Sequence, residues 1–280
     1  MKSYFKFIVS LIVILSLGVP VSANMIKDNI ASVQQADRLQ KIKEKGVLTV
    51  YSANTAPYSY KDPKTGEFRG VDAEIVMELA KRLGVGKVDV RYIPFSNAIN
   101  ELIKNPDVDM IAEGFYITGE REALVNFTIP IYNASEVVVT RRDTGINSKE
   151  DLKNSVVGVL EGTVYRTLAE KWKEQGIIKD YMSFFDNNSL IIGLENKLVD
   201  AVLTDSIIAE NILSSKYKSN FKLLSPSQYK SEINYNTAYP VKKGDDKFLN
   251  EINKKLQEMK EDGTIYEIMS RNGVSRYYIP

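Results

Sequence analysis

The stretch GFYITGER at residues 114–121, followed by NFTIPIY at residues 126–132, decides how the rest of this chain is interpreted. Its residue types suit a ligand clamp. Gly114 allows a backbone to come close to a bound molecule, and Thr118 is a residue type that caps a short helix. Three residues later, Arg121 offers a planar set of donors that matches a carboxylate. We therefore expect a small molecule with a carboxylate to bind at this stretch.

Strand and helix patterns alternate on both sides of the clamp. Apolar residues recur at four-residue steps over 71–83, and strand-like runs of branched residues stand between such segments. This alternation predicts an α/β protein with mainly parallel, doubly wound sheets. The predicted strands cover residues 47–51, 88–93, 108–112, 136–140, 156–160, 181–185, 200–203 and 234–239. The predicted helices cover 28–45, 71–84, 96–104, 163–175 and 189–196, with a final helix from 248 that ends before Gly263.

The order of these elements predicts two lobes. A second α/β series begins after the polar residues 141–143, and the strand near 234–239 returns to the first series. Two crossings between the lobes, near Val138 and Asn236, would give two hinge strands. We expect lobe 1 to comprise residues 24–137 and 238–280, and lobe 2 to comprise residues 138–237.

The N-terminus has the pattern of a cleavable export signal. Lys2 and Lys6 precede an apolar run at 7–19, and small residues follow at 21–23. The alternative is a membrane anchor, but the apolar run is shorter than the roughly 20 residues that a membrane-spanning helix needs. We expect cleavage after residue 23 and a periplasmic or secreted protein. The chain has no cysteine, so we expect neither disulfides nor a lipid anchor.

Composition excludes several classes of function. The chain has 37 basic and 36 acidic residues, and removal of the signal leaves 35 basic residues and a net charge of −1. The basic residues are scattered, so we expect no nucleic-acid partner. The chain has no histidine, the usual general base near neutral pH and a common zinc ligand. We therefore expect a binding protein rather than an enzyme, with no catalytic residue and no metal.

Four motifs together resemble one protein family. They are the clamp at 114–121, ANTAPY at 53–58, GVLEGT at 158–163 and VDAVLTD at 199–205. The chain after Lys45 resembles family 3 of the bacterial extracytoplasmic solute-binding proteins, which serve polar amino acid transporters and have the type II periplasmic binding protein fold. The resemblance implies a monomer without a cofactor, whose two lobes close on a small zwitterion such as an amino acid. It also implies delivery of that ligand to the permease of an ABC transporter.

The resemblance assigns roles to the charged and polar site residues. Arg121, in the pattern Thr-x-x-Arg, would hold the ligand carboxylate by two parallel hydrogen bonds. Gly162 and Thr163 begin a helix whose free amides would hold the same carboxylate from the other side. Asp205 would accept the α-ammonium group. The alternatives are a solvated arginine, an ordinary helix cap and a solvated aspartate in a turn.

Three aromatic residues, Tyr58, Phe95 and Tyr116, lie on loops that would face the same cleft. Many amino acid binders of the family have a threonine at the position of Tyr116. Aromatic residues at these three positions resemble the ectoine-binding branch, where they surround a delocalised cation, an interaction worth roughly 0.5–2 kcal/mol for each ring. A glutamate of that branch is replaced here by Thr55. The alternative for each ring is core packing.

An enzyme similar to cyclohexadienyl dehydratase is the rival interpretation, because that enzyme resembles these binding proteins in fold. It would need a carboxylic acid in the cleft, and Glu113 and Glu161 are the candidates, although no motif supports either. The motif at 70–72 also resembles the family, and we expect Asp72 to serve the structure as a charge at a helix N-terminus.

Overall fold

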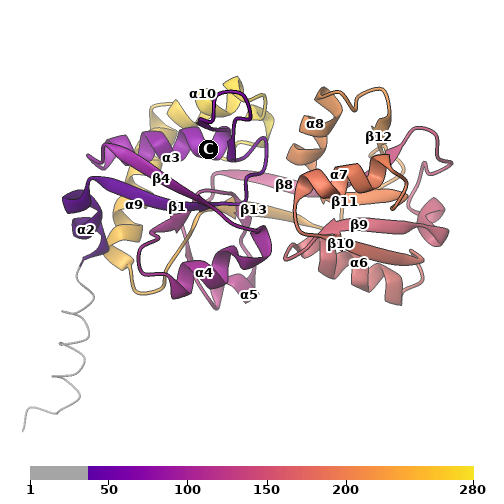
Figure 1. Cartoon of the computed structure of the whole chain (residues 1–280), viewed down its shortest axis with the longest axis horizontal. Helices are drawn as coiled ribbons and strands as arrows, with labels where there is room; N and C mark the ends of the chain where they lie inside the picture. Colours follow the sequence, from indigo (N-terminus) through magenta and orange to yellow (C-terminus); the bar gives the residue numbers. More distant parts are fainter. Residues whose placement is uncertain (1–36) are drawn as a thin grey trace, which may run out of the picture. The chain divides into compact units, whose positions relative to one another are not determined.

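The computed structural model describes residues 37–280, which form one compact unit (Figure 1). The predicted signal at 1–23 and the first part of the predicted lead-in helix lie outside the described residues. The rest of that helix is α2 (Arg38–Lys45), which ends at Gly46 in the left-handed conformation. None of the helices in residues 37–280 is long and apolar enough to cross a membrane.

The first sheet has five strands in the order β4-β1-β5-β14-β7. β4 and β5 run parallel to β1, as the alternation of strands and helices predicts. β14 comes from the C-terminal part of the chain and lies antiparallel between β5 and β7. The strands are β1 (Val47–Ser52), β4 (Lys87–Tyr92), β5 (Met110–Ile111), β7 (Asn126–Phe127) and β14 (Pro240–Val241).

Helices cover both faces of this sheet, with α3 and α10 above it and α4 and α5 below it in Figure 1. Packing follows the predicted apolar faces, since α3 buries Ile75 and Leu79, and α9 buries Phe248 and Leu256. The elements are α3 (Val71–Arg82), η1 (Phe95–Asn97), α4 (Ala98–Lys104), α5 (Gly119–Glu122), α9 (Asp246–Glu261), α10 (Thr264–Arg271) and η3 (Ser275–Tyr277), with a small hairpin of β2 (Tyr60–Lys61) and β3 (Phe68–Arg69).

The prediction that α9 is the final helix is wrong. Gly263, which the sequence analysis takes as the end of the last helix, adopts a left-handed conformation and becomes the N-cap of α10. α10 buries Ile265, Ile268 and Met269 and packs against both α3 and α9. The glycine therefore turns the chain from one helix directly into the next.

The second sheet has the order β10-β9-β11-β8-β13-β6, and β12 pairs with β8 outside this path. β10 and β11 are parallel to β9, whereas β8 is antiparallel to β11. In Figure 1, α7 and α8 lie on one side of this sheet and α6 lies on the other. The elements are β6 (Phe115–Tyr116), β8 (Tyr132–Arg141), η2 (Glu150–Asn154), β9 (Val156–Leu160), α6 (Val164–Glu174), β10 (Asp180–Phe184), α7 (Asn187–Glu195), β11 (Ala201–Asp205), α8 (Ser206–Ser214), β12 (Phe221–Leu223) and β13 (Asn234–Ala238).

The long strand β8 changes partner along its length. Its first residues, 132–135, pair with β13, and its later residues, 136–140, pair with β11. The change occurs at Glu136, whose buried carboxylate accepts hydrogen bonds from Ile233 N (2.6 Å) and the Tyr229 hydroxyl (2.8 Å). The two predicted crossing points, near Val138 and Asn236, lie within β8 and β13.

Candidate functional site

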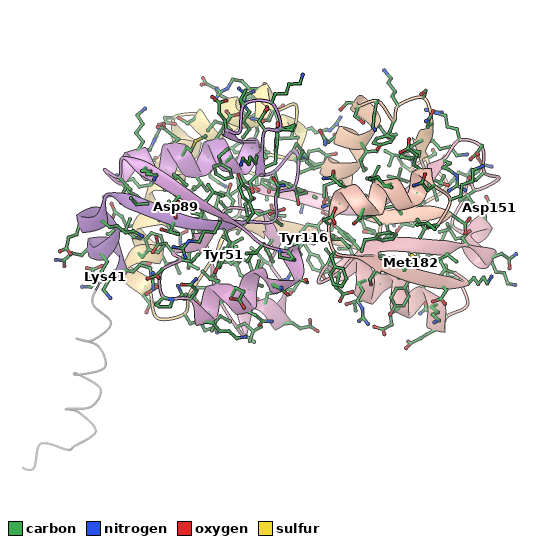
Figure 2. All side chains as sticks on the ribbon, in the orientation of Figure 1. Lys41, Tyr51, Asp89, Tyr116, Asp151 and Met182 are labelled. Atoms are coloured by element: carbon green, nitrogen blue, oxygen red, sulfur yellow. The ribbon has the colours of Figure 1, made fainter. Side chains whose placement is uncertain are left out.

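A cavity of about 40 Å³ lies where loops of the first sheet meet loops of the second. Tyr116, labelled in Figure 2, lies at its wall near the middle of the view. A cavity needs about 10–15 Å³ to hold one water molecule, so this one has room for only a few. A ligand of amino acid size can therefore enter only if the walls move apart. Seven of the eight predicted site residues line the cavity: Tyr58, Phe95, Gly114, Tyr116, Arg121, Thr163 and Asp205. Gly162 borders a neighbouring pocket instead.

Hydrogen bonds from segments on both sides of the cavity hold Arg121 in place. Its backbone N–H donates to the hydroxyl of Thr118, which caps α5 as the sequence predicts. Its guanidinium donates to the carbonyl oxygens of Tyr116 (2.9 Å) and Gly162 (3.2 Å). Burial lowers the pKa of Arg121 to about 10, so the group stays charged at neutral pH. Its further N–H groups can donate to a ligand carboxylate.

The Phe95 ring at the cavity wall packs against Phe115 and against the guanidinium of Arg121. The Phe95 and Phe115 rings are stacked with their centroids 4.2 Å apart. The Arg121 guanidinium lies 5.6 Å from the Phe95 centroid and 4.9 Å from the Phe115 centroid. Such a stack fixes the plane of the guanidinium and adds cation–π attraction.

Gly162 and Thr163 connect β9 to α6 on the side of the cavity that faces Arg121. Gly162 has a φ of +80°, and a Cβ built on it would lie 2.5 Å from Ser96 Cα, so only glycine permits this approach. The Thr163 hydroxyl donates to the Leu160 carbonyl (2.6 Å) and does not cap α6. The first amides of α6 therefore remain without a side-chain cap, which is the usual setting for an anion at a helix N-terminus.

Asp205 ends β11 and begins α8, so it is not a solvated residue in a turn. Its Oδ1 accepts from Ile208 N (2.7 Å), which caps α8, and from the Tyr58 hydroxyl (2.9 Å). Burial raises the pKa of Asp205 to about 6. Near neutral pH its carboxylate is therefore largely ionised and can accept from an ammonium group in the cavity.

Tyr165 is a cavity residue that the sequence analysis missed. It lies in the first turn of α6, donates a hydrogen bond from its hydroxyl to that of Tyr116 (2.9 Å), and packs edge to face with the Tyr116 ring. Its position two residues after Thr163 could have indicated this role, because the N-terminus of that helix is expected to face the cleft. Tyr58 packs differently, with its ring stacked on Tyr132.

Gly114 lines the cavity, and a neighbouring side chain also requires a glycine at this position. A Cβ at this position would lie 1.9 Å from the Tyr132 hydroxyl, so the neighbouring tyrosine leaves no room for a side chain. Asp72 accepts from Gly114 N (2.8 Å), the Tyr132 hydroxyl (2.9 Å) and the Tyr239 hydroxyl (2.8 Å). Although Asp72 lies in the first turn of α3, as predicted, its buried carboxylate fixes the clamp rather than only favouring the helix.

Glu113 also lines the cavity, whereas Glu161 does not. Glu113 is 2% exposed, and its Oε2 accepts from Ala53 N (2.6 Å). Burial, with repulsion from Asp72 and Asp205, raises the pKa of Glu113 to about 8. Within residues 37–280 there is no group of three or more acidic residues placed to hold a metal ion.

Comparison with known proteins agrees with this architecture. The family of bacterial extracellular solute-binding proteins, family 3, matches residues 47–274. The L-cystine-binding protein TcyA of Bacillus subtilis is 29% identical over 252 residues, which cover 89% of this chain and 88% of that protein.

Two solved structures show the same fold. An ancestral arginine-binding protein bound to arginine has a TM-score of 0.72 at 30% identity, and the match covers 81% of this chain and 97% of that chain. The ancestral amino acid-binding protein AncCDT-1, a precursor of cyclohexadienyl dehydratase, has a TM-score of 0.73 at 27% identity and covers 86% of this chain and 100% of its own. The fold is thus that of the type II periplasmic binding proteins, and the chain belongs to family 3 of the bacterial extracellular solute-binding proteins.

Proposed function

We propose that this protein is an extracytoplasmic receptor for an amino acid, which it delivers to the permease of an ABC transporter. The observation that carries the proposal is the pair of opposite charges in one buried cavity, Arg121 and Asp205. In this assignment, the α-carboxylate binds Arg121 and the first amides of α6, while the α-ammonium binds Asp205. A zwitterion satisfies both charges at once, whereas a simple anion or cation would leave one of them buried without a partner.

Binding requires the two halves of the site to separate and close again. We assign the halves to lobe 1 (residues 24–137 and 238–280) and lobe 2 (residues 138–237), with β8 and β13 as the hinge strands. The small cavity volume supports such opening, and the contacts that cross the cavity, Arg121 with Gly162 and Tyr58 with Asp205, support closure around a ligand. We propose that the mature protein is a periplasmic or secreted monomer, released by cleavage after residue 23.

The test is a thermal-shift and calorimetry panel of amino acids on the wild type and on Arg121→Ala. A ligand at 100 times its Kd stabilises the protein by about 2.7 kcal/mol, which gives a visible shift. We expect Arg121→Ala to weaken the best ligand by about 30-fold or more, because loss of one partner of a buried charge pair costs roughly 2–5 kcal/mol. Arg166→Ala, which removes an arginine paired with Glu170 outside the cavity, is the control. Equal affinities for the two variants would refute the clamp.

A second candidate ligand is a compatible solute such as ectoine, with a delocalised cation. The observation in its favour is that Tyr58, Phe95 and Tyr116 all line the cavity. Because the face of Phe95 supports Arg121, two rings rather than three remain to contact a cation. Ectoine therefore belongs in the binding panel.

The enzyme alternative is a dehydratase similar to cyclohexadienyl dehydratase. Glu113 is the observation that favours it, because a buried carboxyl with a raised pKa can donate a proton to a leaving hydroxyl. Incubation with prephenate or arogenate, followed by detection of the aromatic product, decides between the classes. Turnover that is lost in Glu113→Gln would replace the receptor assignment.

A further inference from the structure

Glu113 is an acidic group to which the assignment of the ligand carboxylate and ammonium gives no role. It lies two residues after the end of β5 and on the wall of the cavity, with Tyr58 and Asp205 among the other residues of that wall. Its Oε2 accepts from Ala53 N (2.6 Å), and the hydroxyl of Thr55 donates to the carbonyl of the same Ala53 (3.5 Å). If Arg121 takes the ligand carboxylate and Asp205 takes the α-ammonium, the Glu113 carboxyl still faces the ligand.

Asn187 brings a second acceptor to the same end of the cavity from the other half of the site. It lies at the start of α7 and lines the cavity with Thr55, to whose hydroxyl its amide donates (3.4 Å). Its Oδ1 is buried and has no hydrogen-bond partner within residues 37–280. A buried carbonyl oxygen without a partner is costly, so a donor is expected to meet it when a ligand is bound. Glu113, Thr55 and Asn187 therefore form an acceptor-rich end of the cavity, which we call the acceptor end.

The charges of the cavity point to the kind of group that fills this end. With both carboxyls ionised, Arg121, Asp205 and Glu113 have a net charge of −1, which a neutral zwitterion does not balance. A ligand with a second cationic group provides both the missing charge and the N–H donors for the three acceptors. The other ionisable groups around Glu113 are Asp72 and the tyrosines of the cavity wall.

We propose that the acceptor end binds the side chain of a cationic amino acid, so that this receptor selects ligands with a net positive charge. This proposal rests on the receptor function proposed above and specifies its substrate class. The raised pKa of Glu113 adds a consequence. At neutral pH the carboxyl holds its proton when no cation is present, and the arrival of a cation favours the ionised form, so binding releases a proton to solvent.

The test is calorimetry of L-arginine, L-lysine, L-glutamine and L-methionine on the wild type and on Glu113→Gln. The variant keeps the shape of the side chain and a hydrogen-bonding oxygen but removes the charge. We expect it to weaken arginine and lysine by at least 30-fold and to change glutamine and methionine by less than threefold. Glu120→Gln, which removes an exposed acid next to Arg121 that does not line the cavity, is the control and should leave all four affinities unchanged.

A second readout is the proton balance. Calorimetry of arginine at pH 7 in two buffers with different ionisation enthalpies should show proton release by the wild type, and no release by Glu113→Gln or by the wild type at pH 9.5. Equal loss for cationic and neutral ligands in Glu113→Gln, or absence of proton release, would overturn the acceptor end while leaving the receptor function standing. If the wild type binds no member of the amino acid panel, the receptor proposal itself fails.

Discussion

Replacement of Gly162 by alanine tests whether the two halves of the site meet in the bound protein. Gly162 belongs to the turn between β9 and α6, and Ser96 belongs to η1 beside the first sheet. A Cβ on Gly162 would lie 2.5 Å from Ser96 Cα and 2.8 Å from Ser96 Cβ, whereas ordinary contacts begin at 3.4 Å. The variant therefore has to hold the two backbones about an ångström further apart.

The Gly162→Ala substitution has two separate free-energy costs. The first is the left-handed conformation, about 1–2 kcal/mol for a residue with a Cβ, which is the same whether the site is open or closed. The second is the overlap with Ser96, roughly 1–3 kcal/mol by analogy with overpacked cores, which arises only when the site closes. Only the second weakens binding, so we expect the Kd for the best amino acid to rise by roughly 5- to 150-fold.

The assay is calorimetry of binding together with urea unfolding of the ligand-free protein. Gly176→Ala is the matched control, because Gly176 has a similar φ of +69° and a Cβ there would meet nothing within 4 Å. Both variants should lose similar stability, and only Gly162→Ala should lose affinity. If Gly162→Ala binds within twofold of the wild type, the two backbones do not approach in the bound protein and the closure argument is wrong.

Three further predictions concern the cavity. Asp205→Asn should weaken α-amino acids far more than ligands without a primary ammonium, with little loss of stability because asparagine also caps helices; calorimetry that finds equal loss for both ligand types would refute the role. Tyr116→Thr should change selectivity more than stability, and affinities for a cationic amino acid, a neutral polar amino acid and ectoine that all stay within about twofold would identify Tyr116 as a packing residue. The pKa of Glu113 rises on folding from 4.5 to about 8, so its contribution to stability is fully present below pH 4.5 and is lost as the pH rises through 8. Urea unfolding of the ligand-free protein from pH 5 to 9 should therefore show a steeper decline for the wild type than for Glu113→Gln, and parallel curves would contradict the raised pKa.

The elements with a regular apolar period could be predicted from the sequence. Helix α3 and strand β9 lie close to their predicted bounds, because the repeat of buried residues reports the period directly. Helix α8 was not predicted, although Ile207, Ile208 and Ile212 are buried at helical spacing and the partly buried Glu210 and Asn211 lie between them. The motif around Asp205 predicts only a ligand contact, although an aspartate before an apolar segment is also typical of a helix N-cap, which is its place in α8.

The charged residues of the site follow from motifs, but their surroundings do not. Arg121 could be predicted because its guanidinium suits a carboxylate and its spacing from Thr118 forms a recognisable motif. The ring of Phe95 under that group, the hydroxyl of Tyr132 beside Gly114, and the carboxylate of Asp72 depend on contacts between segments that are far apart in the chain. The pattern of a single sequence does not indicate such contacts, and for Glu113 it suggests only the role of an acid in a reaction.

The place of β14 in the first sheet determines how late in folding the segment with Gly114 and Arg121 can reach its final position. β5 and β7 flank the segment that contains Gly114 and Arg121, yet β14, from residues 240–241, is the strand that lies between them. Before that strand arrives, β7 lacks its pairing partner, so the first sheet holds this segment through β5 alone. Contacts between residues so distant in sequence form slowly, and they require nearly the whole chain to have been synthesised. The affinity for ligand should therefore be among the last properties acquired by a folding chain, and a nascent chain that ends before Pro240 should not capture the ligand.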